Sequence, residues 1–247
     1  MLENDGILPS GGQEPFTLSG NEPSERKIER ADIDLVCLYF SRSFNSSVLI
    51  EPVRSLFDLS FNAFDIFIHA WMSELPVEAE IAFFGRKVIA TAQTGGSLEE
   101  KRIAAERAAC DRADADTLTV LRTAEKVQHE IHRMTGLLRF FHEKDKYIAR
   151  CAPDHFIIPA LGEYFTARFG ETAWAIIDEK RMLRLSSTPG ENAVLVQDDI
   201  FAAANEGDEW EELWRHYHKT INNESRKNTN LQRQFMPKRY WKYLPEV

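Results

Sequence analysis

The amino-acid sequence predicts an α+β fold. We expect a helical N-terminal half, a small and mostly antiparallel sheet with packed helices, and a C-terminal helix followed by a docked basic tail. Apolar residues recur at helical spacing through 52–136, whereas short apolar runs between turn residues fill 137–200. Helices followed by a cluster of strands are typical of this class. Residues 1–28 are rich in Gly, Pro and Ser and predict a disordered arm, which leaves 29–247 as a single domain.

Three helices are expected before the longest one. In residues 52–74 the large apolar side chains recur every three or four positions, which predicts one long core helix or two short ones. The pattern repeats in 77–92 and ends at a Thr-Gly-Gly-Ser sequence. Residues 97–110 form a shorter, charged helix.

The strongest amphipathic pattern ends at Gly136, and we expect Asp116 or Thr117 to cap its start. His129 and His132 lie on this helix at i,i+3, which is close enough to share a metal ion. The pattern lacks the HExxH spacing and no third ligand is evident, so a zinc site is the weaker alternative to a solvated helix face.

The following segment predicts five strands and one helix. Residues 137–151 alternate as two strands joined by a His-Glu-Lys-Asp-Lys turn, and three more strands fill 172–197. Between them, 154–170 predicts a helix with Asp154 as its N-cap and Gly170 as its end.

The C-terminal region, residues 208–247, predicts a helix and a basic tail. Asp208 and Glu211 have capping-box spacing, and an apolar face follows them. Pro237 and Pro245 favour a fixed, non-helical path for the tail.

The charge is distributed unevenly along the chain. The 247 residues have a net charge of -9, yet residues 219–247 contain seven basic and two acidic residues, a net +5. The remaining 218 residues therefore carry -14. A basic tail on an acidic body predicts either an anionic partner for the tail or a tail that lies across the body's own carboxylates.

The tail alternates basic and aromatic residues, a pattern that suits phosphates and stacked bases. With a second basic segment around 129–139, it provides our candidates for nucleic-acid contact: Arg133, Arg139, Arg226, Lys227, Arg233, Lys238, Arg239, Tyr240, Trp241 and Lys242. Alternatively the rings pack into the core. That alternative predicts a deeply buried Trp241 and an Arg239 that pairs with a carboxylate of the body.

An enzyme is the rival hypothesis. His132, Asp154, His155 and Asp178 are the candidate acid–base residues, and they should converge in one pocket near Arg139 or Arg239. The chain has no glycine-rich phosphate loop and no nucleophile elbow.

Other features exclude several classes of protein. Three widely spaced cysteines suit reduced thiols rather than a disulfide framework or an iron–sulfur cluster, so we expect no cofactor on this chain. No apolar run has the length of a membrane span, and the N-terminus does not resemble a signal peptide. We therefore expect a cytoplasmic protein that does not contact membranes.

The closing segment NNESRKNTNLQRQFMPKRYWKYLPEV resembles the end of a bacterial family of unknown function associated with DNA metabolism and DNA repair, whose pattern reads ERxNPxxxxQxMPxRYWKYLxE. The matching residues are Arg226, Asn228, Gln234, Met236, Pro237, Arg239, Tyr240, Trp241, Lys242, Tyr243, Leu244 and Glu246, and Glu224 lies one position before the pattern's Glu. Thr229 replaces the usual Pro, and the family's aromatic-Asp-Gly-Ser/Thr-Phe opening is not found in residues 1–50. The similarity extends over about residues 60–247.

This resemblance implies a two-protein system that acts on DNA. Family members are typically encoded beside a radical S-adenosylmethionine protein, and some relatives are fused to a uracil-DNA-glycosylase-like domain. The resemblance therefore implies a DNA-associated accessory protein, with DNA and a radical S-adenosylmethionine protein as partners. The alternative stays an enzyme that acts on a nucleobase or nucleotide.

Overall fold

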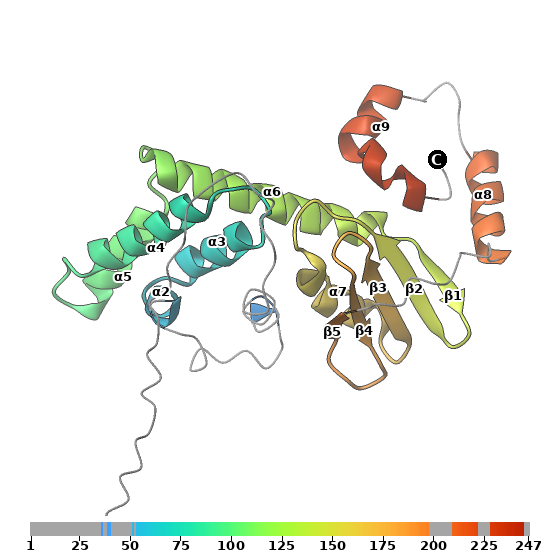
Figure 1. Cartoon of the computed structure of the whole chain (residues 1–247), viewed down its shortest axis with the longest axis horizontal. Coiled ribbons are helices and arrows are strands. Elements are labelled where there is room, and N and C mark those ends of the chain that lie inside the picture. Colours follow the sequence, from blue (N-terminus) through green and yellow to red (C-terminus); the bar gives the residue numbers. More distant parts are fainter. Residues whose placement is uncertain are drawn as a thin grey trace, which may run out of the picture.

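A computed structural model of the whole chain describes residues 36, 39–40, 51, 53–197, 209–221 and 228–244. The expected arm at 1–28 lies outside the described residues, as do Asp208, Arg226, Lys227 and Pro245. The fold is α+β, as the sequence predicts, with a helical half at one end and a sheet at the other (Figure 1).

Among the residues that the structure describes, the helical half contains α2 (Val53–Leu59), α3 (Phe61–Trp71), α4 (Glu78–Ala92), α5 (Leu98–Ala109) and α6 (Ala115–Leu137). Residues 52–74 form two helices because the extended Ser60 interrupts them and its hydroxyl accepts the amide N–H of Ala63. The expected cap of α6 is wrong. Asp114 is the cap, since its extended backbone lets its carboxylate accept the N–H of Thr117 at 2.8 Å.

The sheet has five strands: β1 (Phe140–Glu143), β2 (Lys146–Cys151), β3 (Ala173–Asp178), β4 (Leu183–Ser187) and β5 (Val194–Gln197). They pair in sequence order, and of these five strands only β2 and β3 are parallel. A parallel pair needs a crossover connection. The 3-10 helix η2 (Ile158–Leu161) and α7 (Gly162–Phe169) provide it.

This crossover begins differently from our expectation. Asp154 does not cap a helix, because the helical structure starts only at η2 with Pro159 in its first turn. The backbone N–H of Asp154 instead donates to a carboxylate on α6. Gly170 ends α7 as predicted, with a φ of 57°.

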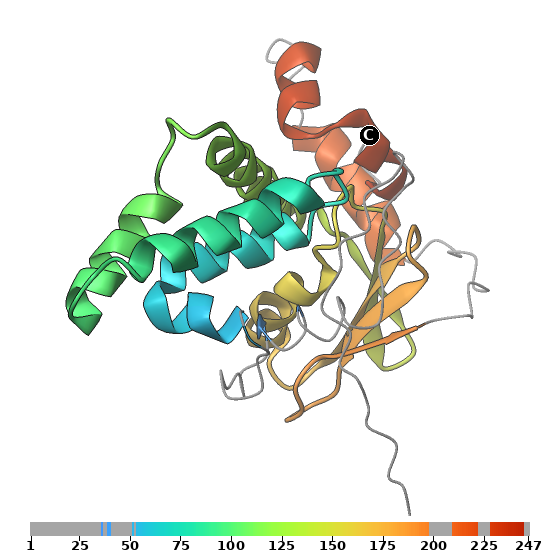
Figure 2. The ribbon, with the colours of Figure 1, turned by 60° about the vertical axis from the view of Figure 1, so that its left-hand side comes forward.

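The helical half and the sheet share one hydrophobic core. Its buried side chains include Phe64 on α3, Val127 on α6, Phe165 on α7 and Ile176 on β3. α6 extends from the helical half to the sheet (Figure 1), and α7 lies between the other helices and the sheet (Figure 2).

The C-terminal region contains α8 (Glu209–Ile221), α9 (Thr229–Phe235) and the 3-10 helix η4 (Lys238–Tyr243). The expected non-helical path of the tail is therefore wrong. Asn228 caps α9 by accepting the N–H of Leu231, and Pro237 separates two short helical pieces. The tail is docked, since Tyr240 and Leu244 are buried in the common core. Within the described ranges, no helix is long and apolar enough to cross a membrane.

Candidate functional site

A buried carboxylate on α6 joins three parts of the chain. Glu130 is 3% exposed and lies in the buried stripe of α6 between Val127 and Met134. Its oxygens accept the backbone N–H groups of Asp154 and His155, both at 2.8 Å, and the hydroxyl of Tyr240. Burial and the contact with this carboxylate raise the pKa of Tyr240. Glu130 therefore connects α6 to the β2–η2 loop and to residues 228–244, which contain α9 and η4 and are called the C-terminal segment below.

Arg181, in the turn after β3, connects the helical half to the sheet. Its guanidinium donates to Asp178 at 2.6 Å, to Glu74 at 2.5 Å, and to the carbonyl oxygens of Pro153 and Asp154 at 3.2 and 3.0 Å. Burial raises the pKa of Asp178, although Arg181 opposes this. This arginine therefore compensates a buried carboxylate and holds the loop that carries Asp154.

His155 lies beside this arginine network. Its Nδ1 accepts the backbone N–H of Glu74 at 3.4 Å and lies 3.5 Å from the Ser73 hydroxyl. Burial lowers the pKa of His155, and the negative charges of Glu130 and Asp154 offset only part of this effect. The lowered pKa and the hydrogen bond that Nδ1 accepts both favour the neutral imidazole.

Two ion pairs connect η4 to the body. Arg239 Nη2 lies 2.5 Å from Asp154 Oδ2. Lys242 Nζ donates to Glu179 Oε2 at 3.3 Å, and the hydroxyl of Tyr243 donates to the same oxygen at 2.7 Å. Burial would raise the pKa of Glu179, but these hydrogen bonds outweigh it and hold the pKa below its usual value. Part of the basic tail therefore faces the acidic body.

The aromatic residues of η4 make cation–π contacts with its basic residues. Arg239 lies over the ring of Tyr240, Lys242 over Tyr243, and Lys238 over Trp241. Tyr240 is buried in the core, so its ring is not accessible to a stacking base. Trp241 is half-buried rather than deeply buried, and its indole N–H donates to the Met236 carbonyl. The packing alternative therefore describes Tyr240, whereas its prediction of a deeply buried Trp241 is wrong.

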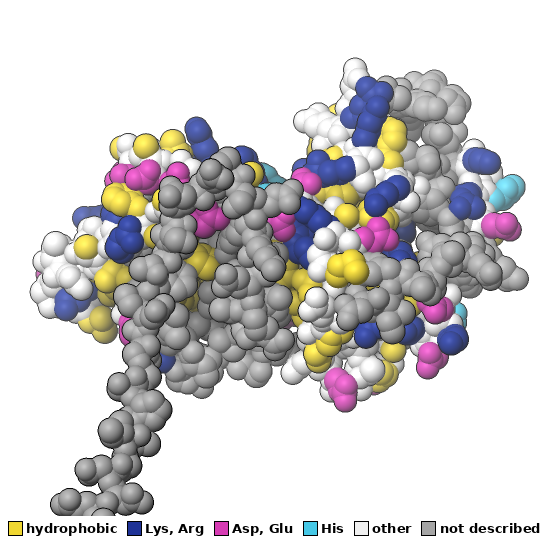
Figure 3. Space-filling view, viewed as in Figure 1, with side chains coloured by type: hydrophobic (Ala, Val, Ile, Leu, Met, Phe, Trp, Pro, Cys, Tyr) yellow, Lys and Arg dark blue, Asp and Glu magenta, His cyan; other side chains and the backbone are white. Residues whose placement is uncertain are grey.

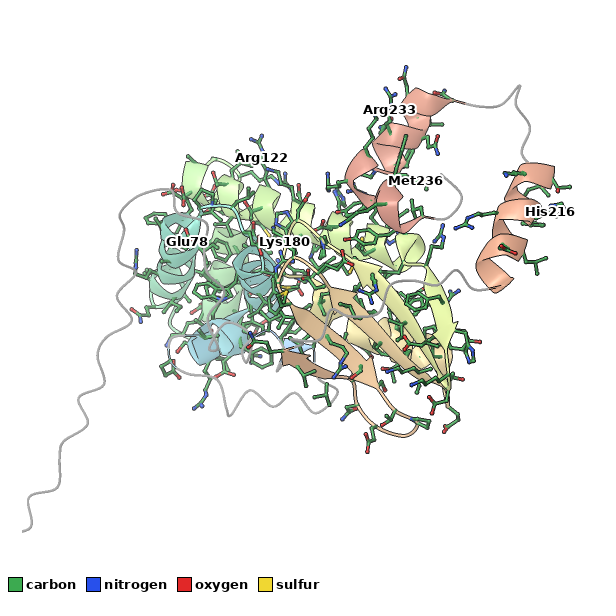
Figure 4. The ribbon with its side chains drawn as sticks, turned by 45° about the vertical axis from the view of Figure 1, so that its right-hand side comes forward. Glu78, Arg122, Lys180, His216, Arg233 and Met236 are labelled. Carbon is green, nitrogen blue, oxygen red and sulfur yellow. The ribbon has the colours of Figure 1, made fainter. Side chains whose placement is uncertain are left out.

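Two other cations of the C-terminal segment are exposed to solvent. Arg233 on α9 and Lys238 on η4 are exposed, and among the described residues no carboxylate pairs with either. Figure 3 shows Lys and Arg side chains gathered over this segment and at the seam between the helices and the sheet. Figure 4 places Arg233 on the outer part of α9 and Lys180 at that seam.

Three of the four expected acid–base residues lie together. Arg181 contacts the carboxylate of Asp178 and the backbone carbonyl of Asp154, and its charge acts on the neighbouring His155. The carboxylate of Asp154 pairs with Arg239. His132 does not join them, because its side chain is exposed on α6.

Within the expected basic segment around 129–139, Glu130 contacts the tail through the hydroxyl of Tyr240. Arg133 is half-buried on α6, and Arg139 donates to the carbonyl oxygens of Gly136 and Leu138. Within the described ranges, no three His, Cys, Asp or Glu side chains group as a metal site.

Sequence reasoning missed Glu130 and Glu74, and from the charged turn at 178–181 it selected Asp178 rather than Glu179 or Arg181. Glu130 had a readable signal, since an acidic residue three positions after Val127 and four before Met134 interrupts an apolar stripe. The other three lie in turns, where charged residues are ordinary and no local pattern indicates their partners.

The family model described as a domain of unknown function, DUF4130, matches residues 98–246, more than half of the chain. The chain belongs to this family. The DUF4130 region contains the sheet, α6 and the whole C-terminal segment, whereas α2–α4 and Glu74 precede it. No curated protein and no solved structure matches the chain.

Proposed function

We propose that this protein is a DNA-associated accessory protein, and that its C-terminal segment binds DNA phosphates. It acts in DNA repair or base modification beside a radical S-adenosylmethionine partner. The observation that carries the proposal is the pair of exposed cations, Arg233 and Lys238, on a segment whose other side is docked to the body. The resemblance of the closing segment supports the DNA setting and the partner.

Phosphate contacts suit these two residues. Lysine and arginine neutralise phosphates without reading sequence, and each contact releases counterions from the DNA. Docking through Tyr240 and Leu244 holds the segment on the core, so the cations need little further ordering when DNA binds. Binding through such contacts should be weak, independent of sequence and strongly dependent on salt.

The test compares two charge-matched double variants. The affinity for a fluorescein-labelled 20-base-pair duplex is measured by anisotropy between 50 and 200 mM NaCl. Arg233→Ala with Lys238→Ala should flatten the slope of log affinity against log salt by up to about two units. Arg107→Ala with Arg122→Ala removes the same charge from exposed positions on α5 and α6.

The control variant should keep the wild-type slope. The proposal would be wrong if the wild-type protein does not bind the duplex, or if its affinity does not change with salt concentration. Equal losses in both double variants would show that only net charge matters.

The enzyme alternative has one observation in its favour, namely that Asp154 and His155 lie together with Arg239 near them. It predicts that the protein alone converts a deoxynucleotide or an oligonucleotide and that His155→Gln abolishes this conversion. Chromatography of the products decides, and an unchanged substrate with wild-type protein rejects it.

A further inference from the structure

The two cations of η4 that pair with the body, Arg239 and Lys242, each lie over a tyrosine ring. Arg239 Cζ lies 4.7 Å from the ring centre of Tyr240, and Lys242 Nζ lies 4.5 Å from that of Tyr243. Each ring is held by its hydroxyl, which donates to Glu130 from Tyr240 and to Glu179 from Tyr243. The charged groups of Arg239 and Lys242 are therefore positioned rather than free to swing.

The carboxylates that pair with these cations remain in contact with water. The Arg239 and Asp154 side chains are 45% and 47% exposed, and those of Lys242 and Glu179 are 60% and 28% exposed. Ion pairs in contact with water contribute little to stability and are screened by salt. Another anion can therefore replace the carboxylates at low cost.

The spacing of the two cations suits a chain of phosphates. Arg239 and Lys242 are three residues apart in a 3-10 helix, where such positions eclipse and rise by about 6 Å. Duplex DNA carries one negative charge for about every 1.7 Å of its axis, so several phosphates lie within reach of the pair.

We propose that Arg239 and Lys242 form a second phosphate-binding site, which Asp154 and Glu179 occupy until DNA phosphates displace them. This inference rests on the proposed DNA-binding function and concerns the regulation of the same surface. The carboxylates act as competing anions within the chain. They weaken binding to isolated phosphates, while a DNA strand that also contacts Arg233 and Lys238 displaces them.

The first experiment removes one competing charge. Asp154→Asn is suitable because the contacts of Asp154 with Glu130, Lys180 and Arg181 use its backbone rather than its carboxylate. Asp145→Asn is the matched control, at an exposed turn residue between β1 and β2. With the labelled duplex, Asp154→Asn should bind about two- to fivefold tighter, with a salt slope steeper by up to about one unit. The control should match the wild type.

A second measurement tests whether Arg239 is the residue released. Arg239→Gln should reduce affinity more in the Asp154→Asn background than in the wild type, by about the same two- to fivefold factor. If Asp154→Asn does not fold, Glu179→Gln and Lys242→Gln pose the same question at the second pair.

The outcomes separate the two proposals. Equal affinities for Asp154→Asn and Asp145→Asn, or equal effects of Arg239→Gln in both backgrounds, overturn the competing-anion site while DNA binding itself stands. No DNA binding by the wild type or any variant overturns both.

Discussion

Replacing Glu130 by Gln probes the contact that joins α6, the β2–η2 loop and the C-terminal segment. Gln has nearly the same shape as Glu, so no cavity forms. One carboxylate oxygen becomes an NH2 group, however, and this group cannot accept a hydrogen bond. The wild-type carboxylate accepts three donors, from Asp154, His155 and Tyr240. At least one of these donors must lose its acceptor in the variant.

The expected loss follows from these contacts. A hydrogen bond to a charged group contributes about 1.5–3 kcal/mol, and a buried donor left without a partner costs about 1–3 kcal/mol. Because such contributions overlap, we expect Glu130→Gln to lower the free energy of unfolding by about 2–3 kcal/mol. Tyr240→Phe removes one donor and leaves the carboxylate in place, so its expected loss is smaller, about 1–2 kcal/mol.

Urea unfolding followed by circular dichroism measures both variants and their double mutant. The sum of the single losses should exceed the loss in the double mutant by about 1 kcal/mol, because the two side chains share a hydrogen bond. Limited proteolysis should cut the C-terminal segment faster in both variants. A loss below about 0.5 kcal/mol in Glu130→Gln would refute the structural role assigned to this residue.

Two further predictions concern pH and backbone conformation. Burial lowers the pKa of His155 in the folded protein below the value of about 6.5 that it has in the unfolded chain. As the pH falls through about 6.5, the unfolded chain therefore binds the proton first, and the folded protein loses stability. His155→Gln should therefore reduce the difference in unfolding free energy between pH 7.5 and pH 5.5, and an unchanged difference contradicts the assignment. Gly170→Ala should lower the free energy of unfolding by about 1–2 kcal/mol, because Gly170 has a φ of 57°. Gly136→Ala should raise it by about 0.5–1 kcal/mol, because Gly136 lies inside α6 and no atom is near the added methyl group. Thermal unfolding compares the two glycine variants, and shifts of the same sign would contradict the conformational argument.

Much of the fold was accessible from local patterns. The helices of residues 52–136 and all five strands lie where apolar spacing predicts them, because a helix or strand must place its apolar residues on one face. The errors occurred where the local pattern was ambiguous. Asp114 rather than Asp116 or Thr117 caps α6, and the tail is helical on both sides of Pro237.

The candidate site was predicted less completely. The sequence alone indicated a basic, aromatic C-terminal segment on an acidic chain, because charge and residue type are properties of the residues themselves. Only the tertiary structure decided which cations face the body and which face solvent. Tyr240 and Glu130 are 110 residues apart, and Arg239 and Asp154, at 239 - 154, are 85 residues apart. Electrostatic attraction and burial depend on distance in space, which the order of residues does not state, so the inward Arg239 and the outward Arg233 look alike until the chain is folded.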